Sequence, residues 1–399
     1  MTTVELAEHG GPVSVPLPDA LGRAVGLSKI VDAVPDPFHA GRWRLQEKWG
    51  KVGVCTIAAP DGTAVTLRIV PKLPVARVLF LLGYQQSPKG WRDDEVTAAE
   101  EAELLPVLAR LFERQAERAL RQGLMQGYHV VEESGPVVRG RIREADQLRR
   151  HHGRLVPVET VHDEYSTDIA ENRLLLAACE RLCRLPQGVP GDVRRGLLRL
   201  RSRLADVSPL VRGRPLPGWR PTRLNARYHH ALRLADLVLR GASVDHLPGG
   251  VTVSGFLFSM PRVFEDFLTV ALREALAGRA VRCAFQDAMA LDENGDITMR
   301  PDLVVYSGAR SPLAVADAKY KVNKTDKALN ADVYQMLAYC TRLGLADGHL
   351  VYAAGEVEAA VHRVMGTPVR VHRHALDLGR SPDELLADVR VLASLLVPS

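Results

Sequence analysis

The sequence predicts an α/β protein with a β-rich N-terminal part and a C-terminal domain in which helices flank a mixed central sheet. In the N-terminal part, apolar and polar residues alternate along 52–57 and 64–70, on either side of the turn residues 60–62. In the C-terminal part, two short apolar runs at 303–306 and 313–320 precede a helical pattern. The region between these parts is mainly helical and rich in charge.

Composition bounds the size and class of the protein. The chain has 399 residues, of which 46% are hydrophobic and 25% charged, so it should hold two or three domains. We predict a β-rich domain over residues 1–95, a mainly helical, arginine-rich connecting domain over 96–245 and a third domain over 246–399. No run approaches about 18 uncharged apolar residues and the N-terminus is acidic, so we expect a cytoplasmic protein without a membrane span or signal peptide.

Helices in the connecting domain follow from apolar periodicity. They are expected over residues 97–126, from 168 to 183, over 197–204 and over 228–239. Prolines and glycines between 209 and 221 indicate an irregular connector before the last of these helices.

A further helix is expected over residues 261–276, where the apolar residues share one stripe. Glu265 lies at the edge of that stripe, and Asp266 lies on the outer face. Glu265 is therefore the better candidate to face an active site. The alternative, an ordinary first-turn acid favoured by the helix dipole, explains Glu265 equally well.

Asp317 and Lys319 form the one acid-x-Lys pair of the chain. Because side chains alternate along a strand, both project from the same face. Asp302 precedes the neighbouring apolar run, so two paired strands would bring two carboxylates and one ammonium together. With nine lysines and 47 acids, about one such pair is expected by chance, and a salt bridge at a solvated strand end is the simpler alternative.

The helical pattern after Lys319 favours a nuclease over that alternative. Gln335 and Tyr339 stand four residues apart and share one helical face. Phosphodiester hydrolysis needs a hard cation on oxygen ligands, an oriented water and a positive charge near the phosphate. Asp302, Asp317 and Glu265 can bind Mg²⁺ or Mn²⁺, and Lys319 can orient the water.

These residues form the sequence pattern of the PD-(D/E)xK nucleases, and the chain resembles the McrC family, the nuclease subunits of modification-dependent McrBC-type restriction systems. The resemblance rests on segments in order along the chain: 67–73, 138–142, 164–173, 256–265 and 299–320. It implies a restriction-endonuclease-like C-terminal fold, with Asp302, Asp317 and Lys319 as catalytic positions and Glu265, Gln335 and Tyr339 as supporting ones.

The same resemblance implies a partner. No GxxxxGK[ST] phosphate-binding loop occurs in the chain, so we expect it to bind no nucleotide by itself. An McrB-like AAA+ GTPase ring would supply the energy and would be stimulated by this chain. The predicted substrate is double-stranded DNA, in modified form. By analogy of position, residues 43–74 are the candidate docking element.

Two alternatives remain open. One is a RecB-like nuclease of another defence or repair assembly. The other is a non-catalytic adaptor that activates a partner GTPase, although the intact set of Asp302, Asp317 and Lys319 argues against a decayed nuclease.

Residues 194–227 contain ten arginines and a single acid. Such density is typical of contacts to phosphates, and Arg199, Arg201, Arg212 and Arg214 are the candidate DNA-binding residues. The alternative is a set of solvated helix faces in an arginine-rich chain.

The five cysteines indicate neither disulfides nor a zinc ribbon, because their number is odd and no CxxC pair occurs. Only Cys340 follows Lys319, so an iron-sulfur cluster of the kind found in some RecB-like nucleases is not expected.

Overall fold

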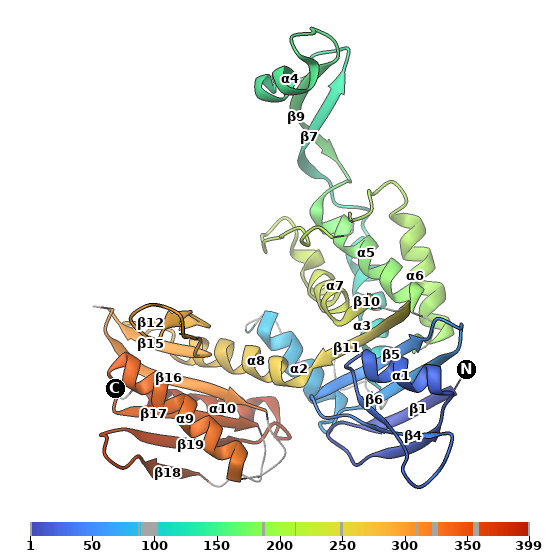
Figure 1. Cartoon of the computed structure of the whole chain (residues 1–399). Coiled ribbons are helices and arrows are strands. Elements are labelled where there is room, and N and C mark those ends of the chain that lie inside the picture. Colours follow the sequence, from blue (N-terminus) through green and yellow to red (C-terminus); the bar gives the residue numbers. More distant parts are fainter. Residues whose placement is uncertain are drawn as a thin grey trace. The chain divides into compact units, whose positions relative to one another are not determined.

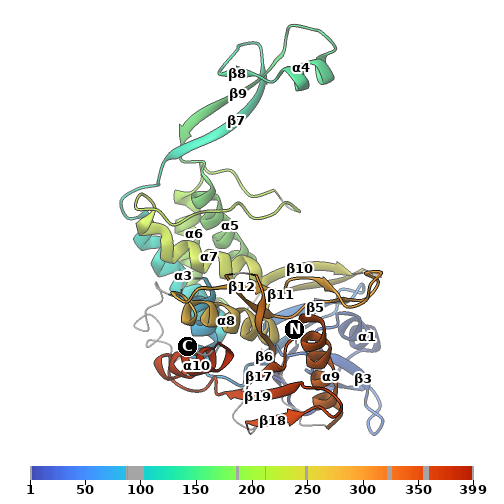
Figure 2. The same ribbon diagram turned by 90° about the vertical axis from the view of Figure 1, so that its left-hand side faces the viewer.

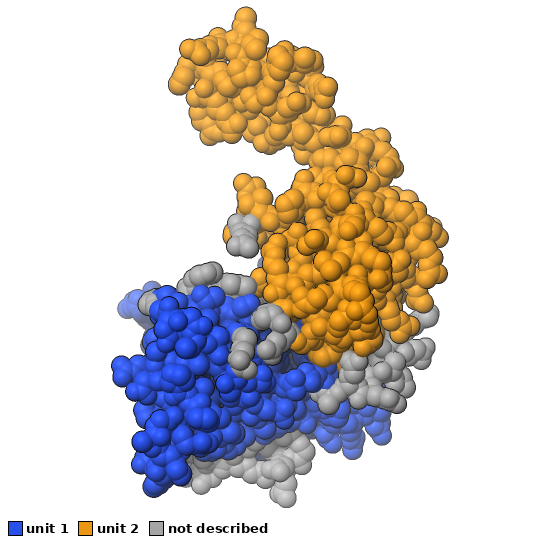
Figure 3. Space-filling model, turned by 90° about the vertical axis from the view of Figure 1, so that its right-hand side faces the viewer, with its two compact units in different colours: residues 1–105, 243–399 blue, residues 106–242 orange. Residues whose placement is uncertain are grey.

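The structure, a computed structural model, consists of two compact units, one of residues 1–105 and 243–399 and the other of residues 106–242 (Figure 3). It describes residues 2–86, 88, 103–185, 188–211, 213–247, 250–308, 310–320, 326–353 and 359–397. The predicted N-terminal and C-terminal domains thus belong to one unit. They are joined because a strand at 251–259, in the predicted C-terminal domain, pairs with the N-terminal sheet.

That sheet has five strands (Figure 1). In spatial order they are β1 (Thr2–Ala7), β6 (Ala64–Val70), β5 (Lys51–Ala58), β11 (Val251–Ser259) and β10 (Ala242–Leu247). The antiparallel pairing of β5 with β6 confirms the predicted hairpin. β11 pairs antiparallel with β5. Residue 53 of β5 has to be glycine, because φ is +124° and a Cβ would collide with the carbonyl oxygen of Phe256.

The segment of residues 13–46, between β1 and β5, packs on this sheet. Helix α1 (Asp19–Leu27) buries Leu21 and Val25 in the same core as Trp43 and Ile57. A three-stranded sheet adds to this layer, in the order β2 (Val13–Pro16), β4 (Arg42–Gln46) and β3 (Asp32–Pro35).

The hairpin proposed for docking is interior to its sheet. β6 pairs with β1 on one side, and β5 pairs with β11 on the other, so neither strand has a free edge. Within the hairpin, the exposed turn residues Pro60, Asp61 and Gly62 are the part best able to meet a partner. If residues 43–74 dock on a partner, as predicted, exposed residues such as these would make the contact.

A mixed six-stranded sheet forms the other part of this unit, as predicted. Its spatial order is β12 (Val281–Phe285), β15 (Leu303–Ser307), β16 (Pro312–Lys319), β17 (Asp347–Ala353), β19 (Arg370–Leu376) and β18 (Ala360–Arg363). The central pairs β16–β17 and β17–β19 are parallel, and the outer pairs are antiparallel. A small two-stranded sheet, β13 (Met289–Ala290) with β14 (Thr298–Met299), lies in the connection before β15.

Helices cover both faces of the six-stranded sheet (Figures 1 and 2). Helix α9 (Asp326–Leu343) packs Met336 and Tyr339 against Val304, Val315 and Leu350. The opposite face carries α8 (Met260–Ala275) and α10 (Pro382–Leu396), and α2 (Val75–Gln86) packs on α8. In the described part of the chain, no helix has the length and apolar character needed to cross a membrane.

The second unit contains helices and a β arm (Figures 1 and 2). Its helices are α3 (Leu104–Leu120), α5 (Ala170–Arg184), α6 (Gly191–Arg203), η2 (Ala226–Tyr228) and α7 (His229–Gly241). They lie where helices were predicted, but α3 ends at Leu120 and not at 126, and α6 begins at Gly191 and not at 197. The predicted residues 97–102 lie outside the described part. The arm, absent from the prediction, extends from these helices and consists of β7 (Gly127–Gly135), β9 (Val158–Ser166), β8 (Arg141–Ile142) and α4 (Glu144–His151).

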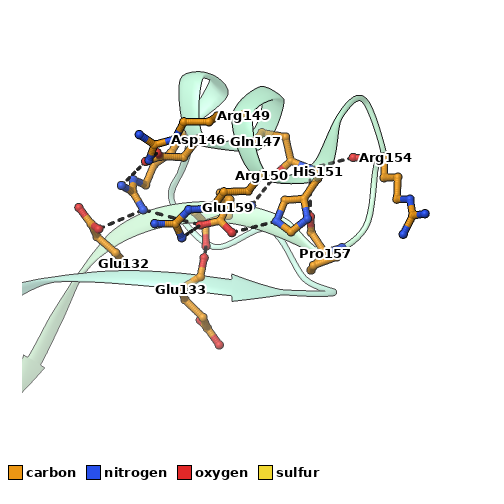
Figure 4. A network of polar contacts seen from close by, with 12 residues as sticks. Glu132, Glu133, Asp146, Gln147, Arg149, Arg150, His151, Arg154, Pro157 and Glu159 are labelled. Atoms are coloured by element: carbon orange, nitrogen blue, oxygen red, sulfur yellow. Dashed lines mark hydrogen bonds and ion pairs between the residues drawn. The ribbon is translucent and has the colours of Figure 1, made fainter.

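A polar network holds the tip of this arm together (Figure 4). The buried carboxylate of Glu159 contacts His151 Nε2 at 2.9 Å and accepts from Arg150 at 3.2 Å. The amide N–H of Glu159 donates to Gln147 of α4 at 2.7 Å. Hydrogen bonds to His151 and Ser134 keep the pKa of Glu159 below its usual value, so the network is held by an ionised carboxylate.

Asn172 closes the base of the arm. Its buried side-chain amide donates to the carbonyl of Met125 at 2.8 Å, before β7, and to that of Thr167 at 2.7 Å, after β9. Beside it, Arg173 forms two hydrogen bonds of 2.7 Å to Asp168, which also accepts from Ser208. The segment 164–173, recognised in the sequence, therefore joins the arm to the helices.

Candidate nuclease site

The paired strands β15 and β16 bring the predicted acids and lysine together. Leu303 lies opposite Ala316, so Asp302 reaches the backbone of β16 and accepts from the N–H of Ala318 at 2.8 Å. Asp317 and Lys319 project from one face of β16, and the Lys319 ammonium forms an ion pair with Asp317 Oδ2. The predicted placement of these three residues is confirmed.

Helix α9 supplies the next two predicted residues. Gln335 Oε1 accepts from Lys319 Nζ at 2.7 Å, and Gln335 Nε2 donates to the Tyr339 hydroxyl at 2.6 Å. That hydroxyl donates to the carbonyl oxygen of Arg300 at 3.3 Å. Burial raises the pKa of Tyr339, so the tyrosine stays a neutral donor. One turn of helix thus connects Lys319 to the loop that carries Asp302.

Helix α8 contributes Glu265, whose side chain contacts that of Asp302 and accepts from Gln286 Nε2. Asp266 lies toward Arg262, with its carboxylate 4.0 Å from the guanidinium and 47% of its side chain exposed. Of the two adjacent acids, Glu265 is therefore the one that faces the site, as the apolar stripe predicted.

The carboxylates repel one another in this arrangement. Burial, followed by the charges of Asp317 and Glu265, raises the pKa of Asp302 to about 8. Burial also raises the pKa of Glu265. A divalent cation would relieve the repulsion, and carboxylate oxygens are the ligands that Mg²⁺ and Mn²⁺ prefer. The donor set has the chemistry for such a cation. Among the described residues, no three His, Cys, Asp or Glu side chains are already arranged to hold a metal ion. Lys319 contacts Asp317, and Gln286 contacts Glu265.

Three residues of the site were missed in the sequence. Gln286 follows β12 with φ +47°, and this turn aims its amide at Glu265. Asp332 lies on α9 with 3% exposure, 3.9 Å from Lys319 Nζ, and it accepts from the Tyr352 hydroxyl at 2.9 Å. The three-residue spacing from Asp332 to Gln335 could have indicated that both lie on one face of the helix. Nothing in the sequence around Tyr352 or Gln286 indicated that these residues belong to the site.

The N-terminal sheet borders this site through Tyr320, the residue after Lys319. The Tyr320 ring lies 6.3 Å from that of Phe264 on α8 and 6.3 Å from that of His9, which follows β1. Its hydroxyl contacts the buried carboxylate of Glu8, and burial raises the pKa of both groups. The N–H of Met260, at the start of α8, donates to Gly50 at 2.7 Å. The end of β16 and the start of α8, two of the elements that carry site residues, are therefore held next to the N-terminal sheet.

Part of the arginine-rich stretch serves the fold of its own unit. Arg194 donates to the carbonyls of Cys183 and Leu185 at 2.6 and 2.7 Å, and Arg203 forms an ion pair of 3.0 Å with Glu117. The candidate DNA-binding residues Arg199, Arg201 and Arg214 are exposed, and Arg212 lies outside the described residues. Their role in DNA binding stays a prediction.

Comparison with known protein families shows to which family the chain belongs. The model of a family described as McrBC 5-methylcytosine restriction system component matches residues 51–353. The chain belongs to this McrBC family. The match spans the N-terminal sheet apart from β1, the arm and the site, and confirms the resemblance recognised in the sequence.

One solved structure supports the fold of this McrBC-family chain. A chain in a half-complex of Thermococcus gammatolerans McrB AAA+ hexamers with bound McrC has a TM-score of 0.58 at 17% identity, covering 99% of this chain and 100% of that one. A chain of the Thermococcus gammatolerans McrBC complex has a TM-score of 0.39 at 20% identity over 69% and 88% of the two chains, too low to indicate a shared fold. No curated protein sequence matches the chain.

Proposed function

We propose that this McrBC-family chain is the nuclease subunit of its restriction system and hydrolyses phosphodiester bonds of double-stranded, modified DNA with Mg²⁺ or Mn²⁺. The observation that carries the proposal is the meeting of four residues: Asp302 just before β15, Asp317 and Lys319 at the end of β16, and Glu265 in the first half of α8. We further assign its C-terminal sheet and helices to the PD-(D/E)xK nuclease fold.

In this proposal Asp302, Asp317 and Glu265 hold the cation through their oxygens. A bound divalent cation neutralises phosphate charge and lowers the pKa of an attacking water. Lys319 faces a non-bridging phosphate oxygen or the water, and its 2.7 Å hydrogen bond to Gln335 fixes where the ammonium points. Tyr339 fixes Gln335 in turn, because its hydroxyl accepts from the amide. Asp302 is held in place by the Ala318 N–H.

We also propose that the chain works with an McrB-like AAA+ GTPase, as the McrC in the solved assembly of similar fold is bound to McrB hexamers. The arm supports this part of the proposal. Its tip exposes large apolar residues that no core of the described chain covers: Val137, Val138, Ile142, Leu148, Leu155 and Val156. Exposed apolar clusters on soluble proteins mark surfaces for partners.

The test is cleavage of methylated duplex DNA in Mg²⁺ by the chain together with its AAA+ partner and GTP. Asp302→Asn, Asp317→Asn and Lys319→Met should each slow cleavage by at least about a hundredfold, because each removes a metal ligand or the positive charge. Asp266→Asn is the matched control, since it removes an adjacent acid that lies toward Arg262, and it should cleave normally.

Two measurements separate the alternatives. Partner binding and stimulated GTP turnover should persist in all four variants, because the substitutions lie at the candidate nuclease site. Stimulated GTP turnover without any DNA cleavage by the unaltered chain would support the non-catalytic adaptor. Cleavage by the chain alone, without partner or GTP, would support the free-standing RecB-like nuclease.

A further inference from the structure

Asp332 is a buried acid at the candidate nuclease site. It lies on α9 one turn before Gln335 and is 3% exposed. Its Oδ2 accepts from the Tyr352 hydroxyl at 2.9 Å, and its Oδ1 lies 3.9 Å from Lys319 Nζ. Tyr352 stands opposite Lys319 in the parallel register of β16 and β17, so the sheet itself holds the tyrosine, the acid and the lysine together.

Lys319 consequently has carboxylates on two sides. Its ammonium forms an ion pair with Asp317 and lies near Asp332, while Gln335 Oε1 accepts from it at 2.7 Å. The two carboxylates differ in their surroundings. Asp317 adjoins Asp302 and Glu265, whereas Asp332 is tied to Tyr352 on β17.

A divalent cation on Asp317 would compete with the Lys319 ammonium for the same oxygens. Two positive charges cannot share one carboxylate without strong repulsion, and a buried ammonium without a counter-ion is costly. Lys319 must therefore keep a second counter-ion if it is to stay at the site while Asp317 binds a cation.

We propose that Asp332 is this counter-ion: a positioning residue that balances the Lys319 ammonium and so leaves Asp317 available to the divalent cation. The inference rests on the proposed nuclease function and adds a role for a residue outside the acid-x-Lys pattern. Tyr352 orients the carboxylate, and Gln335 keeps the ammonium directed toward the site.

The experiment is a double-mutant cycle read out by calorimetric titration of Mn²⁺ into the full chain. Asp332→Asn keeps the shape and an acceptor for Tyr352 but removes the charge, and it should weaken Mn²⁺ binding roughly tenfold, because Lys319 then remains on Asp317. Lys319→Met should bind Mn²⁺ at least as tightly as the unaltered chain. In the Lys319→Met background, most of the effect of Asp332→Asn should disappear.

The outcomes are distinct. An equal loss of Mn²⁺ affinity from Asp332→Asn in both backgrounds would overturn the proposal, since the effect would then not pass through Lys319. Weaker binding by Lys319→Met alone would also overturn it, and this variant does not depend on the folding of Asp332→Asn. Absence of Mn²⁺ binding by the unaltered chain would instead refute the metal site on which the inference rests.

Discussion

His349, on β17, stacks on His372 and His374 of the neighbouring strand β19, with ring centroids 4.9 and 5.2 Å away. The Nδ1 atom of His349 lies 2.9 Å from Nε2 of His374, so one ring donates to the other. Burial lowers the pKa of His349 to about 3 and that of His374 to about 4. The nearby Asp347 acts in the opposite direction but is outweighed. Both rings are therefore neutral in the folded protein at neutral pH.

This cluster predicts acid sensitivity. The folded-state pKa values lie below the ordinary value of 6.5, so the unfolded chain binds more protons as the pH falls from about 6.5 toward 4. Between about pH 7.5 and about pH 5 the free energy of unfolding should fall by about 2 kcal/mol for each buried histidine. We expect His349→Leu to reduce that loss, measured by denaturant unfolding at the two pH values.

His39→Leu is the control, because His39 has 66% of its side chain exposed in the same unit. It should retain the acid-dependent loss of stability, because the stacked histidines are still present. An acid sensitivity as large in His349→Leu as in the unaltered chain would show that the stacked histidines are not its source.

At the scale of single elements, the base of the arm depends on the side chain of Asn172. Asn172 bonds the chain on both sides of the arm, at Met125 and Thr167, and is itself fully buried. The two Arg173 bonds to Asp168 fix the start of α5 next to it and lower the pKa of Asp168.

Replacing Asn172 with leucine should loosen the arm at its base. The substitution leaves two carbonyls without their donor, a change that costs about 1–3 kcal/mol. Hydrogen exchange should accelerate in residues 125–128 and 165–169 before it changes in α6 and α7. Glu180→Gln, further along α5, should not alter exchange at the arm. Unchanged protection from hydrogen exchange in Asn172→Leu would contradict this role of Asn172 at the base of the arm.

At the scale of the whole molecule, some arginines of residues 194–227 hold the fold, and others are exposed on the surface. Arg194 and Arg203 bond to groups of their own unit, whereas Arg199, Arg201 and Arg214 are exposed. Arg199 lies 4.0 Å from Glu113, a distance at which an exposed ion pair contributes little.

Changing Arg199, Arg201, Arg212 and Arg214 together to glutamine should weaken DNA binding equally across sequences. It should also reduce the slope of log affinity against log salt by up to about four units, one for each phosphate that the protein no longer neutralises. Fluorescence anisotropy over a range of salt concentrations measures both effects. Arg23, Arg363 and Arg390, exposed in the other unit, provide a charge-loss control. An unchanged slope in the first set would identify those arginines as solvated surface.

The sequence by itself determined the local elements and the identity of the candidate catalytic residues. The hairpin of β5 and β6, the helices α5 to α9 and the strands β15 and β16 follow from periodicity and turn residues, which act over a few neighbours. The placement of Asp302, Asp317 and Lys319 also followed, because strand alternation and one short turn join them. The helical repeat alone was enough to predict that Gln335 and Tyr339 share one face of a helix.

Tertiary structure decided what depends on contacts between distant segments. The pairing of β11 with β5 unites the two ends of the chain in one unit, and no local pattern encodes which strand is its neighbour. The β7–β9 arm was missed because neither of its strands buries an apolar side chain. Asp332 met Lys319 only when α9 packed on the sheet, and Glu8 met Tyr320 only across two sheets. Burial and charge at such sites arise from residues far apart in the sequence, and the folded chain alone brings them together.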